Sequence, residues 1–168
     1  MRSRIVAIAA VAAALTLQAC VFQPLYGTPA DGRPGIGATL AAISVPEVDS
    51  RVGQQVRNHL LFLFQGGRGP ADARYELRIR AADANRQIAA SQLARTTTAG
   101  TVSVTVSYDL IDLSNNTRID GGTRVGNAAY DRTAQSFANI RAVRDAENRA
   151  AREVAEQIRL TVAARLGS

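Results

Sequence analysis

The chain has 168 residues and a formal net charge of +6, and all 20 of its basic residues are arginines. It contains one cysteine and one histidine, which excludes an internal disulfide and leaves too few soft ligands for a zinc or iron site. The basic residues form no cluster interleaved with aromatic side chains, so the composition argues against a nucleic-acid-binding protein.

Residues 1–19 have the layout of an export signal. Two arginines precede an apolar run over residues 5–17, which contains a single polar residue. The run is 13 residues long, whereas a membrane-spanning helix needs about 20, so we expect the leader to be cleaved. The small Ala19 stands before the only cysteine, Cys20, as in a bacterial lipoprotein signal. We expect Cys20 to be acylated; the alternative, a free thiol, is unusual in an exported protein.

Residues 20–38 are predicted to form the lipidated N-terminus and a flexible tether, because residues 28–37 are rich in proline and glycine. A single folded domain is expected over residues 39–168. Its first strand is predicted over residues 39–45 and is ended by Pro46.

Ser50 and Gly66 are suited to cap a helix predicted over residues 51–65. Apolar residues at helical spacing form one stripe along it: Val52, Val56, Leu60, Leu63 and Phe64. Leu61 and Phe62 lie off this stripe. Either another element covers them or they belong to a binding surface, and the first alternative is favoured.

Alternating apolar and polar residues predict a second strand over residues 74–81, extended past a bend by residues 86–90. Its apolar face carries Tyr75, Leu77, Ile79 and Ala81, and its polar face carries Arg74, Glu76, Arg78 and Arg80. The alternation is still cleaner over residues 101–113, which are predicted to form the third strand.

Ser114-Asn115-Asn116 predicts a tight turn, after which residues 117–129 return as the fourth strand. Three glycines in this strand indicate a bulge or a close approach by another backbone: Gly121, Gly122 and Gly126. A long helix is predicted over residues 140–166, and its alanines let it sit close to a sheet. The predicted fold class is α+β, with a mostly antiparallel four-stranded sheet, both helices packed on its apolar face, and the order β-α-β-β-β-α.

We find no arrangement of residues typical of catalysis. His59 lies on the flank of the first helix's apolar stripe, where structural histidines are common. Asp109 and Asp112 fall on opposite faces of the predicted third strand and cannot share a substrate. We therefore expect no enzyme, no cofactor and no metal, but a membrane-tethered binding or assembly module.

Arg78 and Arg80 are two apart on one strand and therefore lie side by side on its polar face. Such a pair could bind the phosphates or carboxylates of an acidic lipid. Alternatively, both are solvated strand residues paired with Glu76 or with a neighbouring strand.

The segment Cys20-Val21-Phe22-Gln23-Pro24-Leu25-Tyr26-Gly27 resembles the Cys-x-Phe-x-Pro-Leu-Tyr-Gly start of the LPS-assembly lipoprotein family, LptE. Residues 137–139 and 144–150 are similar to the alphaproteobacterial members. Of the family's residues only Cys20 transfers directly, as the lipid attachment site, and the resemblance implies that it is palmitoylated.

This resemblance implies a lipid-anchored protein on the periplasmic side of the cell outer membrane. Family members plug the lumen of the LPS-assembly β-barrel, LptD, assist its folding, and take part in lipopolysaccharide transport to the outer leaflet. They can also bind lipopolysaccharide themselves. An auxiliary lipoprotein of an ABC-type lipid transporter is the alternative, because it could share the same signal and a similar α/β layout.

Overall fold

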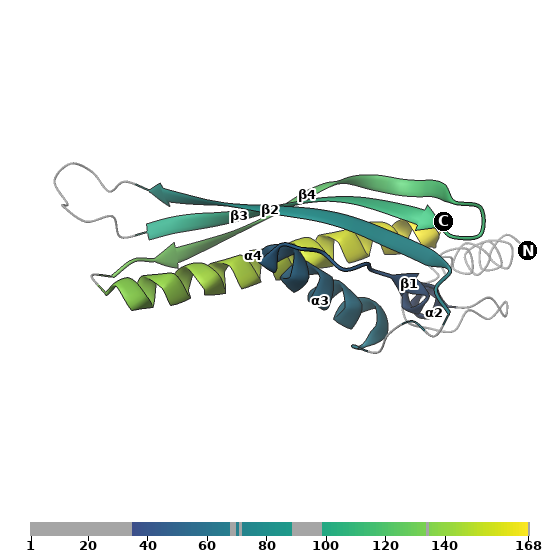
Figure 1. Cartoon of the computed structure of the whole chain (residues 1–168), viewed down its shortest axis with the longest axis horizontal. Helices are drawn as coiled ribbons and strands as arrows, with labels where there is room; N and C mark the ends of the chain where they lie inside the picture. Colours follow the sequence, from purple (N-terminus) through teal and green to yellow (C-terminus); the bar gives the residue numbers. More distant parts are fainter. Residues whose placement is uncertain (1–34, 68–69, 71, 89–98, 134, 168) are drawn as a thin grey trace, which may run out of the picture. The chain divides into compact units, whose positions relative to one another are not determined.

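The computed structural model describes residues 35–67, 70, 72–88, 99–133 and 135–167. The signal, Cys20 and the tether up to residue 34 lie outside the described residues. The elements, in order, are α2 (Ile36–Ala41), β1 (Ile43–Ser44), α3 (Arg51–Gln65), β2 (Tyr75–Ile88), β3 (Ala99–Asp112), β4 (Thr117–Asp131) and α4 (Ser136–Leu166) (Figure 1). In the described part of the chain, every helix is too short or too polar to cross a membrane.

The four strands form one sheet in the order β1-β2-β3-β4, and α3 and α4 lie on the same face of it (Figure 1). This confirms the predicted α+β class and the packing of both predicted helices on one face. The sheet is mixed, however, and not mostly antiparallel as predicted, because β1 pairs with β2 in parallel. The reason is the connection: α3 carries the chain back to the end of the sheet where β1 began, and such a crossover makes neighbouring strands parallel.

The prediction of a first strand over residues 39–45 is wrong for most of its length. Helix α2 occupies Ile36–Ala41, including the last residues of the predicted tether, and only Ile43–Ser44 form a strand. Ile36 and Leu40 are one helical turn apart; Leu40 is buried in the core and Ile36 packs against it. At this spacing the two apolar residues lie on one face of α2, the face toward the core.

Helix α3 begins and ends where the sequence predicts. The Ser50 hydroxyl accepts a hydrogen bond of 3.0 Å from the Gly53 N–H, which satisfies one donor at the helix start. Gly66 ends the helix in the left-handed conformation, with φ of 62°. The predicted stripe faces the core, with Leu63 half-buried. At the same end, the buried Gln65 side chain donates to the Ile43 carbonyl and ties α3 to β1.

The two residues off this stripe differ in their surroundings. Leu61 is half-buried and packs against the core, as the favoured alternative states. Phe62 is 66% exposed, so for this residue the prediction that another element covers it is wrong within the described structure. Val56 and Leu60, on the apolar stripe of the same helix, are fully buried.

Replacing Ser50 with alanine removes the hydrogen bond at the start of α3. We expect the free energy of unfolding to fall by about 1 kcal/mol, as measured by urea denaturation. Ser136→Ala is the control, because Ser136 is exposed at the start of α4, where the N-cap residue Gln135 makes no side-chain cap. Equal unfolding midpoints for the two variants would contradict the capping role.

The three long strands form where the alternating pattern predicts them, and β2 continues to Ile88. Their buried faces meet the helices through one set of residues: Tyr75, Leu77, Ile79, Val102, Val104, Val106, Tyr108, Leu110, Ala128 and Tyr130. The turn at Ser114 is confirmed: the Asp112 carboxylate accepts from the Ser114 N–H, and the Asn115 side chain accepts from the Thr117 N–H.

Strand β4 contains both a bulge and a close approach by another backbone, the two features that its glycines indicate. The register shifts where Leu110 pairs with Asp120 and Ile111 pairs with Arg118, so Ile119 is the extra residue of a bulge. The close approach is at Gly126, where an added Cβ would lie 2.4 Å from the Ala150 carbonyl oxygen. Helix α4 therefore packs its backbone almost directly on β4.

Candidate functional site

Because the helices pack on one face of the sheet, the opposite face of β2, β3 and β4 has no helix over it in the described structure (Figure 1). We call this surface the open face. It is formed by the even-numbered residues from Glu76 to Arg86 on β2 and by the odd-numbered residues from Thr101 to Asp109 on β3 and from Thr123 to Asp131 on β4. Its side chains are mostly arginine, serine, threonine and asparagine, so it is polar, as the sequence predicts.

Arg78 and Arg80 both lie exposed on the open face, but their surroundings differ. The Arg78 guanidinium forms an ion pair with the Glu76 carboxylate. This is the pairing that the solvated-strand alternative predicts. Arg80 has no ion-pair partner among the described residues, so its charge stays available to a ligand. At the same end of the face, Arg118 pairs with Asp109 at 2.7 Å.

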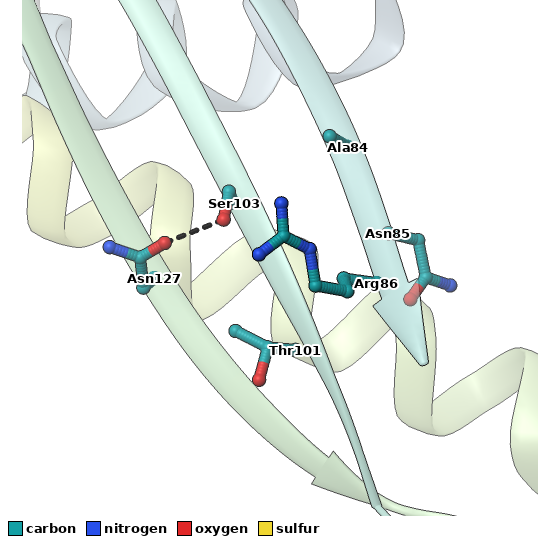
Figure 2. A pocket seen from close by; sticks show the side chains of 6 residues that line it. All are labelled: Ala84, Asn85, Arg86, Thr101, Ser103 and Asn127. Carbon is teal, nitrogen blue, oxygen red and sulfur yellow. Dashed lines mark hydrogen bonds between the residues drawn. The ribbon is translucent and has the colours of Figure 1, made fainter. Parts of the chain in front are cut away.

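A third arginine, Arg86, lies further along β2 at a shallow depression of about 690 Å³. Figure 2 shows its guanidinium reaching across β3 toward Ser103. The Ser103 hydroxyl donates a hydrogen bond of 2.6 Å to the Asn127 side-chain oxygen, which joins β3 to β4 at the floor of the depression. Thr101 also lines the depression, as Ala84 does.

Arg86 is not among the residues predicted for the site, because the sequence predicts a bend between residues 81 and 86. In the structure β2 continues without a break in its pairing with β3, so Arg86 falls on the same face as Arg78 and Arg80. The signal available in the sequence was that even numbers of residues, two and six, separate the three arginines, which places them on one face of a regular strand.

The open face can bind anionic oxygens. The planar guanidinium of arginine donates two parallel hydrogen bonds to a phosphate or carboxylate, and neighbouring hydroxyls add further donors. Of the three arginines on the open face, Arg80 and Arg86 have no ion-pair partner among the described residues, and Arg86 places its positive charge at the depression. Each contact is exposed to water, so affinity depends on several acting together.

Of the described groups with shifted pKa values, one lies on α3 and two lie on β3. Burial lowers the pKa of His59 on α3, and the nearby positive charge of Arg152 lowers it further, while Glu156 opposes both. Burial and the Asp120 carboxylate raise the pKa of Tyr108 in the middle of β3. Hydrogen bonds from Ser114 lower the pKa of Asp112 at the end of that strand. Nowhere in the described ranges do three His, Cys, Asp or Glu side chains gather as a metal site.

Replacing His59 with glutamine should change the pH dependence of stability. The folded state lowers the pKa of His59 below 6.5, so the unfolded chain binds more protons in the interval just below 6.5. The wild type therefore gains stability as pH rises through that interval, and His59→Gln lacks this gain. Urea denaturation at pH 5.5 and about 7.5 measures it. A wild-type advantage that stays the same at both pH values would contradict the assignment.

Comparison with known proteins gives a family model and several related structures. The model LptE, described as "Lipopolysaccharide-assembly", matches residues 39–162. A putative lipoprotein from Caulobacter crescentus is similar in structure with a TM-score of 0.66 and 23% identity, covering 80% of this chain and 97% of its own.

Two further structures share the fold at lower similarity. A minor lipoprotein from Acinetobacter baumannii has a TM-score of 0.53 and 15% identity, covering 74% of this chain and 90% of its own. The rare lipoprotein B from Shewanella oneidensis has a TM-score of 0.54 and 12% identity, and the match covers 73% of this chain and 92% of the Shewanella chain. No curated protein matches the sequence.

Proposed function

This chain belongs to the LptE family of lipopolysaccharide-assembly proteins, and we propose that it plugs the lipopolysaccharide-translocating β-barrel LptD and assists its assembly. In this proposal the protein is a non-catalytic lipoprotein, attached through acylated Cys20 to the periplasmic side of the outer membrane. It takes part there in lipopolysaccharide transport to the outer leaflet.

The observation that carries the proposal is the open face. It is a long polar surface of three strands with exposed arginines and hydroxyls, and no helix among the described residues covers it. The lumen of a large transmembrane β-barrel is polar, so this face has the chemistry to lie against its wall.

Lipopolysaccharide is the second ligand in the proposal. Its acidic groups are phosphates and carboxylates, which arginine binds through paired hydrogen bonds. Arg78 and Arg80 are the candidates from the sequence, and Arg86 joins them by its position at the depression. Arg80 and Arg86 contribute most, because Arg78 also pairs with Glu76.

The experiment that tests the barrel partner is affinity purification of the tagged full chain from detergent-solubilised envelopes. We expect one large outer-membrane β-barrel to be recovered near one-to-one, as identified by mass spectrometry. Recovery of an ATPase and its permease would overturn the proposal in favour of an auxiliary lipoprotein of an ABC-type lipid transporter. Recovery of neither would leave lipid binding by the domain alone as the function to test.

Replacing Cys20 with alanine tests the anchor. We expect the variant to lack acyl groups in the mass spectrum of its N-terminal peptide and to leave the membrane fraction, because the thiol is the attachment point. Gln23→Ala is the matched control within the same motif and should remain acylated. Membrane association of Cys20→Ala equal to that of Gln23→Ala would contradict lipid anchoring at this residue.

A further inference from the structure

The two long edges of the sheet differ in how far other elements cover them. Helix α4 covers the edge formed by β4, because its side chains hydrogen-bond to the strand's backbone. The contacts run from Arg149 to the Ala129 carbonyl (2.7 Å), from the Asn127 N–H to Glu153 (3.1 Å), and from Gln157 and Arg165 to the carbonyls of Val125 (3.4 Å) and Ile119 (3.3 Å). Backbone groups along this edge therefore have partners.

Among the described residues, no strand covers the edge formed by β2 over most of its length. Strand β1 pairs with β2 only at Tyr75 and Glu76, and no other described strand lies beyond it. The Tyr75 N–H donates to the Ala42 carbonyl, and the Tyr75 carbonyl accepts from the Ser44 hydroxyl, so the backbone of Tyr75 faces away from β3. By alternation, the N–H and C=O groups of residues 77, 79, 81, 83 and 85 face the same way.

This edge also lacks most of the features that keep natural edges from pairing. Strand edges are usually short, interrupted by proline, bent by a bulge, or covered by another element. Residues 77–86 contain neither proline nor glycine, and their register with β3 has no shift. The remaining deterrent is charge, from Arg78, Arg80 and Arg86 on the open face and from Asp83 on the other face.

The same three arginines indicate which strand can pair there. A second copy of this chain, pairing through the same edge, would bring an arginine-bearing strand against itself, and like charges on facing strands are destabilising. A strand with carboxylates at alternate positions would instead face Arg80 and Arg86, which have no ion-pair partner among the described residues. Charge therefore selects against the second copy and for an acidic segment.

We propose that the β2 edge, residues 77–86, accepts an extended acidic segment of another protein as an added strand. Main-chain hydrogen bonds to the odd-numbered residues would supply affinity, and carboxylates facing the open-face arginines would supply specificity. The segment could come from any protein that presents such a strand, so this site does not depend on the barrel as partner.

The probe is a synthetic ten-residue peptide (about one strand's length) with glutamates placed opposite Arg78, Arg80 and Arg86 and with threonine or valine elsewhere. Its binding to the full chain in detergent is measured by fluorescence anisotropy and by hydrogen exchange. We expect the bound peptide to slow hydrogen exchange at the amides of Leu77, Ile79 and Ala81. A control peptide with lysine in place of each glutamate should bind at least about tenfold more weakly. Unchanged exchange at these amides would overturn the proposal.

Asp83→Pro separates strand addition from simple attraction to arginine. Proline there removes one outward N–H while leaving the bonds to β3, so we expect peptide affinity to fall about threefold to tenfold. Asp83→Ala removes the same carboxylate but keeps the N–H and should bind at least as well as wild type. A second test uses the wild-type protein and changes only the peptide. Methylation of every second backbone amide of the peptide removes the N–H groups that would pair with β2, so this peptide should not bind. Equal affinity of the methylated and unmethylated peptides would overturn strand addition.

Discussion

Gly126→Ala is expected to lower the free energy of unfolding by about 2–3 kcal/mol, although it adds only one methyl group. The methyl carbon would lie 2.4 Å from the Ala150 carbonyl oxygen and 2.8 Å from a methyl of Val154. Helix α4 cannot retreat without exposing Ala150 and Val154, both of which are fully buried. Urea denaturation of the folded domain measures the loss.

Gly122→Ala is the matched control, because Gly122 lies on the same face of the same strand. An added Cβ there would meet its nearest atoms, on Tyr108 and Arg124, at 3.6 Å, which is an ordinary contact. We expect a change within about 0.5 kcal/mol, or a small gain, because glycine within a strand is itself unfavourable. Similar losses for both variants would show that strand conformation, and not the approach of α4, determines the effect.

The parts of the fold that the sequence predicts well are those specified by neighbouring residues. Helix α3 was predicted to the residue, because Ser50, Gly66 and an apolar stripe all act within the helix itself. Strand β3 was predicted within two residues at its start and one at its end, because its alternation is nearly unbroken. Local signals of this kind need no knowledge of what packs against the element.

The errors concern elements specified by distant contacts. Strand β1 has only two residues and pairs in parallel with a strand about thirty positions away, so its length and direction depend on α3. Helix α2 is short and depends on Leu40 reaching the core, a contact that local composition does not reveal. The exposure of Phe62 likewise depends on which elements pack around α3, and the sequence of the helix does not reveal them.

The candidate site was only partly predictable for the same reason. The polar face and its first two arginines follow from alternation along β2. The depression at Arg86 needs the register of three strands, because Ser103 and Asn127 are brought together by pairing between β3 and β4. Sequence spacing within one strand cannot identify such a neighbour.

Reversing the charges of Arg78, Arg80 and Arg86 together to glutamate should weaken lipopolysaccharide binding by at least about a hundredfold. Each change replaces a donor to phosphate with a repelling carboxylate, and the three lie on one strand of the open face. Single substitutions should have smaller effects, because each contact is exposed to water. Titration of the full chain in detergent with lipopolysaccharide, at low and high salt, measures both the loss and its screening.

The control reverses Arg141, Arg144 and Arg152 on α4, which are exposed on the other side of the molecule. Both triple variants change the net charge equally, so a general electrostatic effect would weaken binding in both. We expect the α4 variant to bind within about twofold of wild type, because its arginines cannot contact a ligand on the open face. Equal losses would mean that net charge alone attracts the lipid; unchanged binding by the open-face variant would remove that face from lipid recognition.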